Sequence, residues 1–202
     1  LPTPTALFSI NGSSADTLYA CKSLLATISN QSYMNNPGNT AGLISSWYLN
    51  GVRQSVSMPS PVFNLRNLSY TRDTLIEIRL IVASSAGCLD TISKYVRLFP
   101  EPLASFTING SSATCALPNN GLIKLVTNNS LYKAPAQHQW TVFNVTSGLP
   151  FSGVRISNNT VPAPVFTFPD NVSASDTTYE LRYRVTTVDG CFKEDRKSTR
   201  LN

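Results

Sequence analysis

One sequence motif occurs twice in the chain, at its beginning and again near its middle. Residues 2–15 read PTPTALFSINGSSA and residues 100–113 read PEPLASFTINGSSA, so ten positions are identical 98 residues apart. A repeat of this length is too long for a solenoid unit and has the size of a small domain. We therefore predict two copies of one module, residues 1–99 and residues 100–202.

The repeat continues beyond its opening, with a drifting offset. Trp47 is matched by Trp140, 93 positions on, and Gly87-Cys88 is matched by Gly190-Cys191, 103 positions on. Such drift means insertions and deletions, which loops tolerate better than strands. The variable loops are therefore expected between these anchors.

The predicted junction is short and contains two prolines. Pro100 and Pro102 each fix φ and lack an N–H, so the linker is expected to be stiff. The two modules should touch, with a limited relative angle. Both chain ends coincide with module ends, so we expect the chain to be part of a longer array.

Alternation of apolar and polar residues predicts strands. Residues 75–82 place Ile76, Ile78, Leu80 and Val82 on one face, and residues 179–185 repeat the pattern. Only 13% of the residues are charged, against roughly 25% in an ordinary soluble domain, and Ser, Thr and Asn take their place.

About seven short strands per module predict an all-β protein of two tandem immunoglobulin-like β-sandwiches. In such a sandwich the third strand carries the central tryptophan. We expect four aromatic residues in the cores, namely Trp47, Trp140, Phe8 and Phe106. The expected strands are 6–10, 24–29, 43–50, 52–56, 61–68, 75–82 and 89–99, then 104–108, 122–127, 138–144, 153–157, 163–168, 179–185 and 192–201.

The combination of Gly87-Cys88, a strand, and then Pro-x-Pro-x-Ala-x-Phe resembles the junction between tandem PKD-type domains of Bacteroidota surface and secreted proteins. A Cys before the second strand and a Trp on the third also match that family. The resemblance implies an extracellular spacer or adhesive module, often exported by the type IX system. The family's Trp-Asp-Phe-Gly-Asp-Gly motif is absent, since residues 47–51 read WYLNG and residues 140–144 read WTVFN, so the roles of those Asp residues are not carried over.

Four cysteines, Cys21, Cys88, Cys115 and Cys191, allow three pairings. In an immunoglobulin-like sandwich Cys21 and Cys88 would lie at opposite ends, roughly 30 Å apart, whereas a disulfide needs Cα atoms within about 7 Å. Head-to-tail stacking favours an inter-module Cys21–Cys191 bond, which leaves Cys88 and Cys115 for neighbouring modules. Pairing within each module and unpaired thiols are the alternatives.

Few residues suggest catalysis or metal binding. His138 is the only histidine and is expected to be a partly buried strand residue rather than a base. The eleven carboxylates are scattered, and Asp73 and Asp176 precede long strands, where a turn aspartate is ordinary. An acid pair for glycoside cleavage is the minor alternative, with no residues assigned to it. Two asparagine pairs are read as turn formers rather than calcium ligands, at residues 35–36 and 119–120. We expect no enzyme activity, no cofactor and no metal.

Charge and modification motifs give weaker indications. The last strand carries a basic cluster of Lys193, Arg196, Lys197 and Arg200. We expect this cluster to protect a sheet edge against aggregation, and binding of anionic glycans or nucleic acid is the alternative. Asn-x-Ser/Thr occurs eight times, a density expected by chance in this composition. Four Asp-Thr motifs look like Bacteroidota O-glycosylation sites, at Thr17, Thr74, Thr91 and Thr177, with plain turn chemistry as the alternative.

These observations favour a non-catalytic extracellular or cell-surface module, a stiff spacer from a large adhesin or filament. Its expected partners are neighbouring repeats of the same polypeptide, other copies in a filament, or surface glycans, with no nucleic acid and no membrane insertion. The rival hypothesis is a carbohydrate-binding accessory region of a secreted enzyme, acting through exposed aromatics such as Tyr48, Tyr70 or Tyr132.

Overall fold

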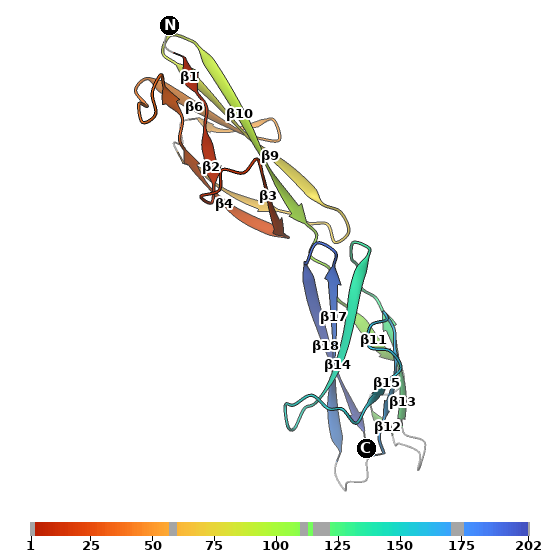
Figure 1. Cartoon of the computed structure of the whole chain (residues 1–202). Coiled ribbons are helices and arrows are strands. Elements are labelled where there is room, and N and C mark those ends of the chain that lie inside the picture. The colour runs from red at the N-terminus through yellow and green to blue at the C-terminus, as the bar shows by residue number, and fades with distance from the viewer. Residues whose placement is uncertain (1–2, 57–59, 110–112, 115–121, 171–175, 202) are drawn as a thin grey trace. The chain divides into compact units, whose positions relative to one another are not determined.

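A computed structural model describes residues 3–56, 60–109, 113–114, 122–170 and 176–201. The chain divides into two compact units, Leu1–Pro100 and Glu101–Asn202, which we call module 1 and module 2. Every regular element within the described ranges is a β-strand (Figure 1). Among these residues there is no helix long and apolar enough to cross a membrane.

The larger sheet of module 1 has five strands in the order β3-β10-β9-β6-β7. These strands are β3 (Thr17–Cys21), β6 (Leu43–Leu49), β7 (Val52–Val56), β9 (Thr74–Ser84) and β10 (Leu89–Phe99). β3 runs parallel to β10, whereas the other pairs are antiparallel. Buried and half-buried residues alternate along β9, as a strand packed on one face requires.

The smaller sheet of module 1 packs against the larger one. It has the order β2-β4-β8, with β2 (Phe8–Ile10), β4 (Ser23–Asn30) and β8 (Val62–Arg66), all antiparallel. A separate two-stranded ribbon joins β1 (Pro4–Thr5) to β5 (Tyr33–Met34). Two facing sheets with a parallel first-to-last strand pair define an immunoglobulin-like sandwich.

Module 2 repeats this plan with one change at an edge. One sheet has the order β12-β18-β17-β14 and the other β11-β13-β16-β15. Its strands are β11 (Phe106–Asn109), β12 (Ala113–Thr114), β13 (Leu122–Asn128), β14 (Ala136–Asn144), β15 (Arg155–Ile156), β16 (Val165–Phe168), β17 (Thr177–Thr187) and β18 (Phe192–Leu201). The added strand of module 1, β7, pairs with the larger sheet, whereas β15 pairs with the β16 edge of the smaller sheet.

Each module encloses its own apolar core. Burying one large apolar side chain contributes about 1.5–3 kcal/mol, so these residues supply most of the driving force for folding. The largest fully buried side chains of module 1 are Trp47, Phe8, Ile10, Ile28, Ile78, Leu80 and Leu98. Those of module 2 are Trp140, Tyr183, Phe106, Phe166 and Phe168.

The repeated Pro-x-Pro-x-Ala-x-Phe motif forms a bend at the start of module 1. The chain leaves β1 after Thr5 and enters β2 at Phe8, so the intervening N–H groups lie outside both ladders. Side chains accept them instead: Asp90 Oδ2 accepts the Ala6 N–H at 2.7 Å, and Ser32 Oγ accepts the Leu7 N–H at 3.1 Å. Polar side chains thus replace the missing ladder partners of the bend.

Module 2 satisfies the same bend in the same manner. Ser130 Oγ accepts the Ser105 N–H at 2.9 Å, and Asp195 Oδ2 accepts the Phe106 N–H at 3.1 Å. Ser32 and Ser130 thus have the same role in the two copies. The aspartates accept from different N–H groups, that of Ala6 in module 1 and that of Phe106, the counterpart of Phe8, in module 2.

The strands expected from periodicity are all present, and short strands are added to them. β3 was not predicted, because its five residues pair only at one end of β10 and show no clean alternation of buried and exposed positions. The expected strand at residues 153–157 is reduced to the two residues of β15. The prediction of about seven strands per module therefore describes the sandwich but not its short edge pairings.

Candidate functional site

The four predicted core aromatics lie at equivalent places in the two modules. Phe8 meets Trp47 edge to face, with ring centroids 5.2 Å apart, and Phe106 meets Trp140 in the same way at 4.9 Å. All four side chains are buried. Such pairs add about 0.5–1.5 kcal/mol beyond their burial and fix the sheets against each other.

The cysteines of module 1 lie at opposite ends of β10. Cys21 is in register with Phe99 at the last residue of β10, whereas Cys88 directly precedes Leu89 at its first. An 11-residue strand spans roughly 35 Å, far beyond the reach of a disulfide. Cys21 is disulfide-bonded and Cys88 is a free, half-buried thiol, so a Cys21–Cys88 bond does not form.

Cys191 of module 2 is also disulfide-bonded. It occupies the same turn as Cys88, because its carbonyl accepts the Thr187 N–H at 2.9 Å just as the Cys88 carbonyl accepts the Ser84 N–H at 2.9 Å. Two equivalent turns thus hold cysteines in different redox states. Cys115 lies outside the described residues.

Each cation of the basic cluster on β18 has a carboxylate partner. Lys193 pairs with Glu101 at 3.5 Å, Arg196 with Glu194 at 2.8 Å, and Lys197 with Asp195 at 2.9 Å; Arg200 pairs with Asp176. This pairing reduces the field that the cluster presents to an anionic ligand. The arrangement agrees with a charged strand at the side of a sheet.

The Asp-Thr motifs place their aspartates in structural roles. Three of the threonines, Thr17, Thr74 and Thr177, are half-buried at the first residue of a strand, whereas Thr91 is exposed on β10. Asp16 lies 3.8 Å from Lys94, and Asp73 lies 2.8 Å from Arg97. Asp90 accepts the Ala6 N–H at 2.7 Å, and Asp176 pairs with Arg200. Among the four threonines, Thr91 is the most accessible to a modifying enzyme.

Several Asn-x-Ser/Thr sequences are turns in which the asparagine side chain is engaged. Asn67 is buried, and its Nδ2 donates to the carbonyls of Arg72 and Leu98 at 2.8 and 2.9 Å while its Oδ1 accepts the Ser69 N–H. The Oδ1 atoms of Asn30, Asn128, Asn144 and Asn158 likewise accept the N–H two residues on. Asx turns therefore account for the density of this sequence pattern. Asn171 lies outside the described residues.

His138 is part of a buried aromatic network on β14. Its Nδ1 lies 2.7 Å from Tyr183 Oη, and Asn128 Nδ2 donates to the same oxygen at 3.0 Å. Burial lowers the pKa of His138 below its usual 6.5 and raises the pKa of Tyr183 above 10.0. The imidazole is therefore mainly neutral at pH 7 and shares a hydrogen bond with the Tyr183 hydroxyl, as a partly buried strand residue, which is the role expected from the sequence.

Two of the three tyrosines proposed for sugar stacking are packed against other side chains. The Arg79 guanidinium lies 5.0 Å from the ring centroid of Tyr48, and Tyr132 meets His138 edge to face at 5.4 Å. Tyr70, in the loop between β8 and β9, is 44% exposed. The residues expected to bind carbohydrate therefore offer one accessible ring rather than a platform.

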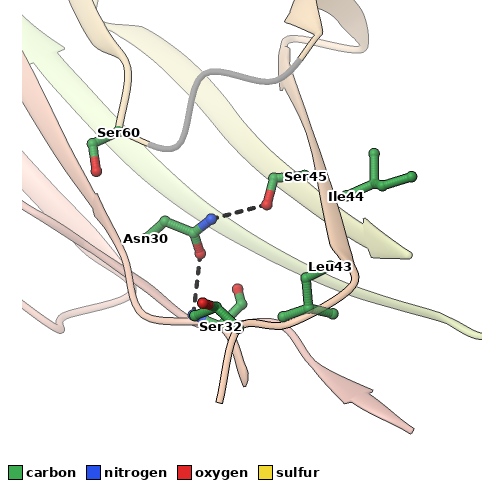
Figure 2. Close-up of a pocket in the computed structure, with 7 residues that line it drawn as sticks. Asn30, Ser32, Leu43, Ile44, Ser45 and Ser60 are labelled. Carbon is green, nitrogen blue, oxygen red and sulfur yellow. Dashed lines mark hydrogen bonds between the residues drawn. The ribbon is translucent and has the colours of Figure 1, made fainter. Parts of the chain in front are cut away.

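A pocket that the sequence did not predict lies in module 1. It has a volume of about 460 Å³ and is lined by Asn30, Ser32, Thr40, Leu43, Ile44, Ser45 and Ser60. Figure 2 shows Asn30 at its centre, donating through Nδ2 to Ser45 Oγ at 2.9 Å and accepting the Ser32 N–H at 3.1 Å. The lining combines hydroxyls and one amide with two aliphatic side chains.

The described residues contain no group of three or more His, Cys, Asp or Glu side chains placed to hold a metal ion. Asn35 and Asn36, one of the two asparagine pairs, form a turn: Asn35 has φ of 60°, and the Asn36 N–H donates to the Met34 carbonyl at 2.6 Å. The other pair, at residues 119–120, lies outside the described residues.

Comparison with protein-family models finds no match. Comparison with curated proteins finds no match either. Among solved structures, the chain is similar to an I-band fragment of titin, with a TM-score of 0.52 and 10% identity over 100% of this chain and 65% of that chain. It is also similar to three domains of the bacteriophage RB49 outer capsid protein Hoc (TM-score 0.48, 8% identity, 98% of this chain and 69% of that chain) and to mouse cadherin-23 (TM-score 0.48, 13% identity, 100% and 66%).

The fold defines the class: an all-β protein of tandem immunoglobulin-like domains. The chain spans 65% of the length of the titin fragment. At this identity the likeness concerns the fold alone.

Proposed function

We propose that the chain is a non-catalytic structural module of a large extracellular protein, in which PKD-type sandwiches act as stiff spacers in a surface adhesin or filament. The observation that carries this proposal is the contrast between Cys191, which is disulfide-bonded, and Cys88, which is a free thiol in the equivalent turn. Cys88 and Cys191 lie in equivalent turns at the end of their modules. A cysteine at that place can form a disulfide with the adjacent module more easily than with a residue inside its own module.

The proposed joint is a Cys21–Cys191 disulfide. Cys21 ends β3 and Cys191 lies in the turn between β17 and β18, so each is at an end of its own sandwich. Both are disulfide-bonded, and Cys88 is not the partner of Cys21. The prolines at positions 100 and 102 already limit the conformations of the linker, so the disulfide has fewer conformations left to exclude.

The repeated local contacts support a load-bearing role inside each module. The Phe–Trp pairs, the Asp–Arg pairs and the Ser and Asp acceptors at the bend occur in both copies. All of them connect a strand of the sandwich to its first or last segment. Contacts at strand ends resist separation of the termini, which is where a spacer is pulled.

A disulfide persists in an oxidising compartment, which supports an extracellular or cell-surface location. Neighbouring repeats of the same polypeptide are the proposed partners of both module ends. In this account Cys88 binds a Cys21-like residue of a preceding module. The Bacteroidota origin and type IX export implied by the PKD resemblance belong to the same proposal.

Residual dipolar couplings test the stiffness of the joint. In the oxidised protein the two modules should report one shared alignment tensor, because a stiff joint makes them tumble together. In Cys21→Ser the two tensors should differ in magnitude, whereas Cys88→Ser should behave as the unaltered protein. Different tensors in the unaltered oxidised protein would remove the basis for a stiff spacer.

A further inference from the structure

The two modules share a hydrogen-bonded frame at the end of β4 in module 1 and of β13 in module 2. In module 1, Asn30 Oδ1 accepts the Ser32 N–H, and Ser32 Oγ bonds the Leu7 backbone. In module 2, Asn128 and Ser130 make the same contacts with the Ser105 backbone. Because the frame uses the Oδ1 atom of each asparagine, the Nδ2 group is free to donate to a side chain of the opposite sheet, and this partner differs between the two modules.

Module 2 fills the neighbouring space with its own rings. The residue two positions before Trp140 is His138, and the residue opposite Trp140 on β17 is Tyr183. Asn128 Nδ2 donates to Tyr183 Oη, which lies 2.7 Å from His138 Nδ1, and Tyr132 packs against His138. The Asn128 Nδ2 group is thus hydrogen-bonded to a side chain of its own module.

Module 1 has smaller side chains at the same two positions. Ser45 precedes Trp47 by two residues and Leu80 lies opposite it on β9. The Asn30 amide turns to Ser45 Oγ at 2.9 Å, and the pocket of about 460 Å³ opens beside it (Figure 2). The pocket is therefore lined by Ser45 at the position where module 2 carries the His138 ring, and the Asn30 amide that bonds Ser45 is the counterpart of the Asn128 amide that bonds Tyr183.

We propose that this pocket of module 1 binds one neutral, hydroxyl-bearing six-membered ring, that is, a hexose unit of an uncharged glycan. Its volume lies within the range of small-ligand sites. Among the described residues the lining consists of Asn, Ser, Thr, Leu and Ile, so these residues offer no charge to balance an ionised ligand. A charged sugar would lose hydration without gaining an ion pair.

The lining chemistry matches such a ring in both of its aspects. Ser45, Thr40 and Ser60 present hydroxyls, each of which both donates and accepts, as do the hydroxyls of a sugar. Leu43 provides an aliphatic wall for the C–H face of the ring, whereas the Ile44 side chain points away from the pocket (Figure 2).

The test is an NMR titration of the ¹⁵N-labelled full chain with methyl β-glucoside, methyl β-galactoside and methyl α-mannoside, with methyl β-glucuronide as the charged comparator. At least one neutral glycoside should give saturable shifts at the Asn30 side-chain amide and the Ser45 backbone amide, and the glucuronide should bind at least tenfold more weakly. No saturable shift at these amides up to about 50 mM of any neutral glycoside would overturn the proposal.

Two variants locate the binding. Ser45→His combined with Leu80→Tyr copies the ring packing of module 2 and should reduce the affinity at least tenfold. Because that change reaches the core, Leu43→Asp provides a second variant on a half-buried side chain of the pocket lining and should also weaken binding. Thr27→His adds an imidazole on the outward face of β4 and should leave the affinity unchanged. Unchanged affinity in both pocket variants would likewise overturn the proposal, and neither outcome bears on the stiffness of the joint.

Discussion

Arg97 on the last strand of module 1 binds Asp73, the residue before β9, through both Nη2 and Nε, at 2.8 and 2.9 Å from the same carboxylate oxygen. Arg200 and Asp176 repeat this pair at the matching place in module 2. Each pair joins the start of one long strand to the end of the next. The Asp-Thr sequence at these positions thus has a structural use in both copies.

Asp73→Asn should lower the free energy of unfolding of module 1 by about 0.5–1 kcal/mol. The effect is modest because the Arg97 side chain is 49% exposed and its charge is screened by water. Urea denaturation followed by tryptophan fluorescence measures it. The difference from the unaltered protein should narrow in about 1 M NaCl, and an equal difference at low and high salt would argue against an ion pair.

Lys94→Met should destabilise module 1 by about 1–3 kcal/mol. The Lys94 ammonium is buried, donates to the carbonyls of Ser14 and Ala15, and lies 5.8 Å from the Phe8 ring centroid. The substitution leaves both carbonyls without their donor. Denaturation midpoints at constant m-value give the size of the loss.

The second module provides a matched control for this change. Lys197 lies 5.1 Å from the Phe106 ring centroid but is 37% exposed and pairs with Asp195. Lys197→Met should therefore cost about 1 kcal/mol or less. Equal losses in the two variants would show that burial of Lys94 has no special role.

Phe8→Ala should destabilise module 1 by about 3–5 kcal/mol, because it removes a fully buried ring from the contact with Trp47. Each module has its own core, so module 2 should keep its stability. Amide peak intensities in a urea series, resolved by residue, follow the two modules separately. Phe106→Ala should give the reverse pattern, and a single concerted transition in both variants would contradict independent cores.

The strand pattern of this protein was readable from the sequence because its sandwiches bury one face of each long strand. The alternation in β9 and β17 fixes which residues point inward, and the drifting repeat locates the loops. The short strand β3 was missed because it pairs through its backbone with β10 and buries little. The β-propensity and the apolar periodicity of a sequence do not reveal a strand that is held only by backbone pairing.

The pocket of module 1 was also beyond the reach of pattern analysis. It opens beside Ser45, and neither Ser45 nor Leu80, the residue opposite Trp47, looks unusual in a strand. A direct alignment of the two copies would have shown His138 and Tyr183 at these places and pointed to the difference in volume. Cys21, Cys88 and Cys191, in contrast, could be placed at module ends from strand order alone.

The stability of module 2 should fall as the pH drops from about 7.5 to about 5. Burial lowers the pKa of His138 below its ordinary value of 6.5. The unfolded chain therefore takes up a proton at a higher pH than the folded chain, and the stabilising contribution present above 6.5 is lost as the pH falls through that value towards the folded pKa. Tyr183, which is hydrogen-bonded to the imidazole, has a pKa raised above 10.0 by burial and therefore stays protonated throughout this range.

His138→Gln keeps a hydrogen-bonding side chain at this position and removes the titration. Its unfolding free energy should depend less on pH across this window than that of the unaltered protein. The comparison uses urea denaturation at half-unit pH steps. Identical slopes in the two proteins would show that His138 does not contribute to the pH dependence.

Peptide mapping of the non-reduced protein, with free thiols alkylated before digestion, tests the central claim most directly. The account predicts a disulfide-linked peptide pair that contains Cys21 and Cys191, together with an alkylated Cys88. A linked pair that contains Cys21 and Cys88 would contradict it, because the joint would then lack its bond.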